Sequence, residues 1–337
     1  MPRASVIGLS FLLLSVAAAS YGGEAEPAAF LGDWQGEGLA AQVIPRGGGQ
    51  YQINFVPEFD VKCKPLAVIT GQAADGVLRF EQEGWSGQAA AGQMKGSRPG
   101  TAAGAAAGAD FELKKVVRPS PTVGDKPPAG AVVLFDGRGF DAWEAQAAKT
   151  SPVEISWELC EDFMRVAPAD KEKGRGHSLI TKQAFRDFQM HFEFRLALMP
   201  DKTGQARSNG GLAFGDANWY EIQVLDSYGL EGLDNECGGI YRIAAPAVNM
   251  CRPPRMWQTY DIDYLAPRYN ADGQRTQAGR ISVRHNGVPI HKDVELPDSP
   301  AAEKRRQTNP ESIPTGRIIL HYHRDPVEYR NIWLVKK

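Results

Sequence analysis

The chain has 337 residues, of which 42% are hydrophobic and 23% are charged, as in ordinary globular proteins. This length allows two domains. Lys and Arg number 38 and Asp and Glu 40, and no long run of one sign occurs, so the sequence lacks the charge excess that binds nucleic acid through its phosphates. We therefore expect no nucleic-acid partner.

The first twenty residues have the pattern of a secretory signal peptide. Arg3 precedes an apolar run at residues 6–16, and small residues follow at 17–20. The run is shorter than the eighteen or so apolar residues of a membrane-spanning helix, and no other stretch reaches that length. We expect an exported protein, periplasmic or secreted, without a transmembrane segment.

The four cysteines, Cys63, Cys160, Cys237 and Cys251, lack the close pairing of a zinc site. In an oxidising compartment, Cys237 and Cys251 can close a short loop through a disulfide. The alternative is a pair of buried free thiols, and we expect the disulfide.

Residues 28–117 predict a small β domain, because short apolar runs alternate with glycines. Residues 87–108, rich in Ala and Gly, predict a loose hairpin or loop. Trp34, Phe80 and Trp85 can form a ligand platform, but a small domain also needs large aromatic residues in its core, and we expect the core role. No function is assigned to this domain.

Residues 118–130 contain four prolines and few apolar side chains, which predicts an inter-domain linker. Residues 131–337 then form a succession of short apolar-alternating runs with almost no helical periodicity. The Asn286-Gly287 pair is a hairpin signal. About ten strands in this region predict a sandwich of two antiparallel sheets.

Residues 220–229 place acidic and amide groups at strand spacing among aliphatic residues. Because side chains alternate along a strand, Ile222 and Val224 can enter a core while Glu221 and Gln223 project together from the other face. The alternative is an ordinary strand with a solvated polar face.

Two other runs have the same design. Residues 188–197 and 318–323 each alternate apolar side chains with polar ones. If these strands share a sheet with residues 220–224, their polar faces form one groove. The groove would carry Glu193, Arg195, Glu221, Gln223, His321 and His323.

Six motifs follow one another along residues 132–337. They are Leu134-Phe135-Asp136-Gly137 with Trp143, residues 179–188, residues 220–226, residues 257–261, His285-Asn286-Gly287 and residues 323–333. In this order they resemble the 3-keto-disaccharide hydrolase family. The resemblance implies a concanavalin-like jelly roll and action on 3-keto-glycosides, which a separate sugar dehydrogenase would supply.

The chain departs from the family pattern at two places. Asn209-Gly210-Gly211 stands where the family has Asn-Ser-Gly, and only His323 of His321-Tyr322-His323 falls on the family's histidine. We therefore expect some substrate contacts to differ.

The implied chemistry needs a base, an acid and an enolate stabiliser, because a ketone at C3 acidifies the hydrogen on C2. We expect Glu221 to be the base, His323 to protonate the leaving group, and Arg195 or a divalent metal to stabilise the enolate. The expected substrate-binding residues are Glu193, Asn209, Gln223, Asp226, Tyr241 and His321.

A metal cofactor is left open by the sequence, because no spacing of its donors specifies a site. The candidate donors are Asp226, Asp234, Glu236, Asn249, His321 and His323.

Two alternative functions use the same fold. Glu221-x-Gln223-x-x-Asp226 is similar to the acidic strand of retaining glucanases, although Gln223 cannot act as the middle carboxylate and Asp226 is one methylene short. A non-catalytic carbohydrate-binding jelly roll is the other alternative. Its aromatic platform would use Trp219, Tyr220, Tyr241 and Trp257.

Overall fold

The structure is a computed structural model that describes residues 28–100, 108–146, 153–167, 176–215, 220–272, 274–298 and 316–337. Across these ranges the chain forms strands and one short 3-10 helix, Gly204–Ala206, so the all-β class is confirmed. The expected signal peptide and Trp219 lie outside the described residues. Within them, no helix is long and apolar enough to cross a membrane.

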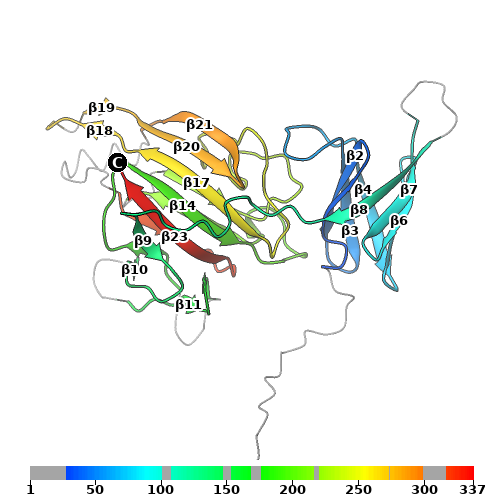
Figure 1. Cartoon of the computed structure of the whole chain (residues 1–337), viewed down its shortest axis with the longest axis horizontal. Helices are drawn as coiled ribbons and strands as arrows, with labels where there is room; N and C mark the ends of the chain where they lie inside the picture. The colour runs from blue at the N-terminus through cyan, green and yellow to red at the C-terminus, as the bar shows by residue number, and fades with distance from the viewer. Residues whose placement is uncertain are drawn as a thin grey trace, which may run out of the picture.

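The N-terminal unit is a closed antiparallel barrel of eight strands, in which β1 pairs with both β2 and β8. It stands on the right in Figure 1, beside the C-terminal unit. Trp34, Phe80 and Trp85 are buried in its interior, and Trp85 stacks on Phe55 with ring centroids 4.2 Å apart. These aromatic residues therefore form the barrel core. The strands are β1 (Gly32–Gly36), β2 (Leu39–Pro45), β3 (Gln50–Val56), β4 (Ala67–Ala74), β5 (Val77–Gln82), β6 (Trp85–Ala90), β7 (Gln93–Arg98) and β8 (Ala109–Val116).

The C-terminal unit is a jelly-roll sandwich. Its five-stranded sheet has the order β10-β13-β22-β15-β16, and its larger sheet has the order β11-β12-β23-β14-β17-β20-β21 with β9 paired to β23; β18 and β19 form a separate ribbon. The strands are β9 (Val132–Phe135), β10 (Trp143–Ala145), β11 (Glu158–Leu159), β12 (Met164–Arg165), β13 (Leu179–Thr181), β14 (Phe188–Arg195), β15 (Gly210–Phe214), β16 (Tyr220–Val224), β17 (Trp257–Leu265), β18 (Arg268–Tyr269), β19 (Arg275–Gln277), β20 (Gly279–His285), β21 (Val288–Leu296), β22 (Ile318–Leu320) and β23 (Glu328–Lys336).

The sandwich core lies between the two sheets. Phe192 and Phe194 of β14 meet Ile222 and Val224 of β16 in one buried cluster, as the alternation of each strand predicts. The polar residues between these positions must therefore face outward, away from the core, on opposite sides of the sandwich.

This arrangement corrects the expected groove. Glu193 and Arg195 belong to the larger sheet, whereas Glu221 belongs to the five-stranded sheet and His321 directly follows its strand β22. Arg195 pairs with Glu328 and its guanidinium lies 4.5 Å from the Trp257 ring. The expectation that Arg195 and Glu193 share a surface with Glu221 is wrong, because strand alternation does not reveal which sheet a strand joins.

The Pro-rich segment 118–130 is bound to the outer face of the larger sheet. The Ser120 hydroxyl lies 2.6 Å from Thr259 Oγ1, and the Gly124 N–H donates to Glu193 Oε1 at 2.6 Å. These polar contacts fix the segment along the sheet. The prediction of a linker rested on its few apolar side chains. Glu193 is therefore an anchor for the segment, and its expected contact with substrate is wrong.

A buried charge network surrounds Glu193. Burial opposes charge on His191, but hydrogen bonds with Asp261 at 2.6 Å and Glu193 at 3.3 Å raise the pKa of His191 to about 9. Burial also opposes charge on Glu193, but hydrogen bonds from His191, Asn331, the Gly124 N–H and Arg330 lower its pKa to about 2. Both groups are therefore charged at neutral pH.

The expected disulfide is absent, since Cys237 and Cys251 are buried free thiols. Cys237 Sγ lies 3.2 Å from the Tyr260 hydroxyl, and Cys251 Sγ lies 3.6 Å from the Leu225 carbonyl oxygen. Each sulfur is thus held by hydrogen-bonding neighbours and not by a covalent bridge.

Glu193→Gln is expected to lower the free energy of unfolding by about 3 kcal/mol at pH 5.5, because it leaves His191 and Arg330 without their buried counter-charge. The pKa of Glu193 is lowered from 4.5 to about 2, so its contribution is present above pH 4.5 and is lost as pH falls through 2. The pKa of His191 is raised from 6.5 to about 9, so its contribution to stability is present below pH 6.5 and is lost as pH rises through 9.

Urea unfolding at pH 5.5 and pH 3 measures this effect, and the difference from wild type should shrink at pH 3. Glu295→Gln is the matched control, because Glu295 is 59% exposed and 3.5 Å from Arg280, and should change stability by less than about 0.5 kcal/mol. Equal effects of the two substitutions would contradict the assigned role of Glu193.

Candidate active site

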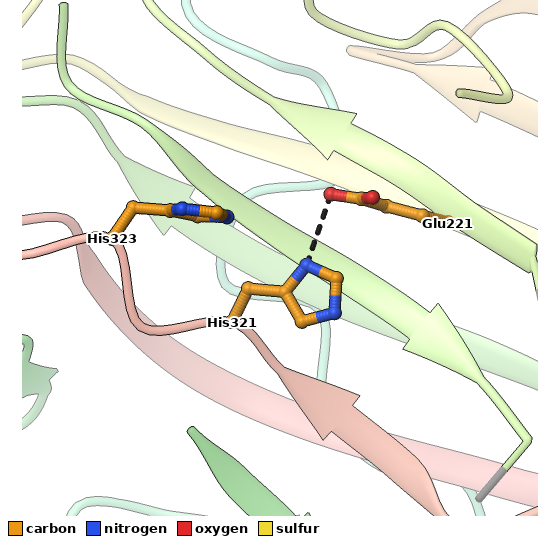
Figure 2. A group of neighbouring side chains, drawn as sticks. All are labelled: Glu221, His321 and His323. Carbon is orange, nitrogen blue, oxygen red and sulfur yellow. Dashed lines mark hydrogen bonds and ion pairs between the residues drawn. The ribbon is translucent and has the colours of Figure 1, made fainter. Parts of the chain in front are cut away.

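Glu221, His321 and His323 gather on the outer face of the five-stranded sheet. Glu221 is on β16, His321 and His323 follow β22, and β15 lies between these strands. The pairing sets Glu221 beside Ala213 and Ala213 beside Ile319. His321 Nδ1 reaches across β15 to within 3.0 Å of Glu221 Oε1 (Figure 2). The structure thus brings together Glu221 and His321, two of the six residues that the sequence placed in one groove.

Gly211 makes this approach possible. It lies on β15 opposite Gln223, and its carbonyl accepts the His321 N–H at 2.9 Å. A Cβ at this position would overlap Glu221 Oε1 and would lie 2.6 Å from His321 Nδ1. The second glycine of the Asn-Gly-Gly segment therefore leaves the space in which the acid and the imidazole meet.

His323 completes the group. Its ring is nearly perpendicular to that of His321, with centroids 5.7 Å apart, and Figure 2 shows both rings beside the Glu221 carboxylate. Partial burial and the His321 imidazole lower the pKa of His323, which Glu221 and Asp325 partly oppose. His323 is thus neutral at pH 7, and part of its side chain remains accessible to solvent.

Amide side chains border the three residues. With its amide nitrogen turned toward Glu221, Gln223 donates to Glu221 Oε1 at 3.0 Å and to the Gly210 carbonyl at 3.1 Å. Asn209 Nδ2 donates to the Gln205 carbonyl at 2.8 Å. Gln223 therefore lies next to Glu221, while Asn209 and Gln205 lie beside Gln223.

Tyr241 borders the site at the edge of the sheet. Its N–H donates to the Glu221 carbonyl at 2.9 Å, and the adjacent Ile240 is buried in the core. This hydrogen bond and the bridge between Ile222 and Ile240 place the Tyr241 backbone beside Glu221.

Asp325 was not singled out from the sequence. Its Oδ2 accepts the Asn209 N–H at 2.8 Å, and burial raises the pKa of its carboxyl group. Its closeness to His323 in the sequence was the only hint of a role. Because β22 ends at Leu320, the alternation of a strand could not predict where the Asp325 side chain lies.

Asp226 does not face this group, which corrects its expected contact with substrate. It is 2% exposed, and its Oδ2 lies 2.7 Å from Arg207 Nε. Retaining hydrolysis needs two carboxyl groups at the sugar. Asp226, the second carboxyl group of the glucanase-like pattern, instead forms a buried ion pair with Arg207.

The remaining candidate donors and platform residues lie elsewhere. Glu236 Oε2 accepts the Gly232 and Leu233 N–H groups, and Asn249 Nδ2 donates to the Ser227 carbonyl, so both stabilise loops. Tyr220 is buried in the core. Trp257, on the larger sheet, is covered by arginines. Among the described residues, the aromatic platform expected for a binding module does not form.

The chemistry of Glu221, His321 and His323 suits a divalent cation. One donor atom from each residue lies within 4.8 Å of the other two, and a carboxylate with two imidazoles is a common ligand set for divalent transition metals. His321 Nε2 is buried without a hydrogen-bond partner in the described part of the chain. These three residues would hold the ion.

Comparisons with known proteins give one family match and several similar solved structures. A family model described as a 3-keto-α-glucoside-1,2-lyase-like domain matches residues 130–335, while no curated protein matches the chain. A solved structure from Parabacteroides distasonis ATCC 8503, described as a candidate glycosyl hydrolase, is 30% identical and covers 62% of this chain and 85% of its own, with a TM-score of 0.49. A second from the same organism, with the same description, is 16% identical and covers 62% and 94%, with a TM-score of 0.42.

Gly211→Ala is expected to weaken binding of Mn²⁺ or Co²⁺ at least tenfold, because the new methyl group separates Glu221 from His321. Calorimetric titration of each ion measures the affinity. Gly139→Ala is the control, since a Cβ there meets nothing within 4 Å. Equal affinities of the two variants would show that the proposed ligand set is wrong.

Proposed function

Because residues 130–335 place this chain in the 3-keto-α-glucoside-1,2-lyase-like family, a family of carbohydrate-active, glycosidase-like domains, we propose that it cleaves 3-keto-glycosides. The observation that supports this proposal is the convergence of Glu221, His321 and His323 on one outer sheet face. A carboxylate and two imidazoles supply the proton-transfer groups and the cation ligands that such cleavage needs.

The reaction breaks the C2–H bond first. The C3 ketone stabilises the carbanion as an enolate, and collapse of the enolate expels the C1 oxygen, which leaves as an alcohol once protonated. Water then adds at C1 and a proton returns to C2, which gives net hydrolysis without any change of oxidation state. Release before the addition of water would make the same site a lyase.

Glu221 is proposed as the group that takes the C2 proton. It is only partly buried, and its Oε1 receives hydrogen bonds from His321 and Gln223, which orient the carboxylate. His323, which is neutral at pH 7, is proposed to accept the proton that Glu221 removes from C2 and to deliver it to the departing C1 oxygen. When water adds at C1, the same groups would carry a proton in the reverse direction. Asn209 and Gln223 are proposed to bind sugar hydroxyl groups, with Tyr241 at the edge of the sugar.

The enolate requires a positive partner, and Arg195 lies on the other sheet. A divalent cation held by the same three residues would polarise the C3 carbonyl and lower the energy of the enolate. The substrate is proposed to come from a separate sugar dehydrogenase, since this chemistry consumes a ketone that it does not create. Export, as the N-terminal pattern predicts, would place both reactions outside the cytoplasm.

A 3-keto-disaccharide is expected to be cleaved while its unoxidised parent is not. In deuterated water, recovered product should carry deuterium at C2, because water supplies the returning proton. Chromatography and mass spectrometry measure both outcomes. Cleavage of the parent at a similar rate, or product without deuterium, would exclude the elimination mechanism.

Glu221→Gln is expected to lower kcat/KM about 10³-fold and His323→Gln about 10²-fold, the range for loss of a general base or acid. Glu144→Gln is the matched control on β10 of the same sheet, where Glu144 is 49% exposed and pairs with Arg317; it should retain activity. Titration of Glu221→Gln with Mn²⁺ distinguishes the two proposed roles of Glu221. If the variant binds Mn²⁺ normally but is inactive, Glu221 abstracts the proton; if it loses both binding and activity, Glu221 is a metal ligand.

A further inference from the structure

The N-terminal barrel is joined to the sandwich directly after the strand that carries Glu221. The Tyr228 hydroxyl, fully buried, donates to Asp33 Oδ1 of β1 at 2.6 Å. Asn54 Nδ2 of β3 donates to the Gly229 carbonyl at 2.7 Å. A Cβ at Gly229 would overlap Ile44 Cδ1, so barrel and sandwich touch without intervening space at this point.

A polar chain along the barrel leads to the same contact. Arg46 Nη2 donates to Gln52 Oε1 at 2.6 Å, and Gln52 Nε2 donates to Asn54 Oδ1 at 2.7 Å. Asn54 then binds Gly229. Arg46, at the end of the β2–β3 hairpin, is thus connected through two amide side chains to the segment that follows β16.

The same hairpin reaches a second segment of the sandwich, residues 199–209. A Cβ at Gly47 would overlap Asp201 Oδ1. Arg46 also interacts electrostatically with the buried Arg207–Asp226 pair. Burial and the Arg207 guanidinium lower the pKa of Arg46, and the Asp226 carboxylate partly opposes this shift. The barrel hairpin therefore packs where residues 199–209 and the end of β16 come together.

Both segments lead directly into the candidate site. The Asp226 N–H donates to the Arg207 carbonyl at 3.2 Å, which ties the start of β15 to the end of β16. Asn209 follows Arg207 by two residues and Gln223 precedes Asp226 by three, while Gln205 contacts both amides. A displacement of this junction would move the amide groups and leave Glu221, His321 and His323 on the sheet.

We infer that the barrel is a positioning element of the active site: its β2–β3 hairpin, with Arg46 as the principal side chain, holds residues 199–209 and 225–229 so that Gln205, Asn209 and Gln223 face the sugar. This inference rests on the proposed function for the identity of the ligand. It assigns a role in substrate binding to a unit that lies outside the family match.

The test compares the full-length chain carrying Arg46→Met, Arg46→Lys or Arg79→Met. Arg79, exposed on β5, is the matched control. Arg46→Met is expected to raise KM for a 3-keto-disaccharide about tenfold with kcat within about threefold, and to leave Mn²⁺ affinity unchanged. Hydrogen–deuterium exchange in residues 199–209 should accelerate. Arg46→Lys should recover most of the KM, because it restores the positive charge.

The exchange measurement is independent of turnover, so the inference and the proposed function fail separately. If the wild type cleaves no 3-keto-glycoside, the proposed function is wrong, and exchange alone decides whether the barrel positions residues 199–209. Exchange and KM equal to those of Arg79→Met would overturn the inference. Should Arg46→Met fail to fold, Tyr228→Phe removes the Asp33 hydrogen bond at constant volume and is judged by the same readouts.

Discussion

The site depends on an approach between Glu221 and His321 that only a glycine at position 211 permits. Glycine within a strand costs about 0.5–1 kcal/mol of stability relative to alanine, whereas a hydrogen bond to a charged group contributes about 1.5–3 kcal/mol. The pairing therefore more than offsets the weaker strand. It also sets the orientation of the carboxylate, since strand residues on either side of Gly211 supply both hydrogen bonds to Oε1.

The two outer faces of the sandwich use polar alternation for opposite purposes. On the larger sheet, residues 118–130 cover Glu193, and Glu193 and His191 each have hydrogen-bond partners of opposite charge within the protein. On the five-stranded sheet, His323 stays exposed and His321 Nε2 has no partner among the described residues. Polar groups whose hydrogen bonds are all made within the protein stabilise the fold, whereas polar groups without a protein partner are available to a ligand.

Local pattern could predict which side chains of a strand share a face, and it did so for Glu221 with Gln223 and for Ile222 with Val224. It could not predict sheet membership, because β14 and β16 join different sheets through pairings between distant segments. Arg195 was therefore placed with Glu221 although it lies on the opposite side. The burial of Asp226 could not be predicted from the sequence either, because its partner Arg207 lies in a different segment, just before β15.

The Arg207–Asp226 pair gives the barrel an electrostatic contact with the segments that border the candidate site. A buried carboxylate is costly unless its charge is compensated, and burial does raise the pKa of Asp226. Arg207 from the sandwich and Arg46 from the barrel both oppose that shift. The ionised state of Asp226, and with it the junction of β15 and β16, thus depends on charges from both units. A domain outside the family match can in this way influence the geometry of amide groups that lie on its neighbour.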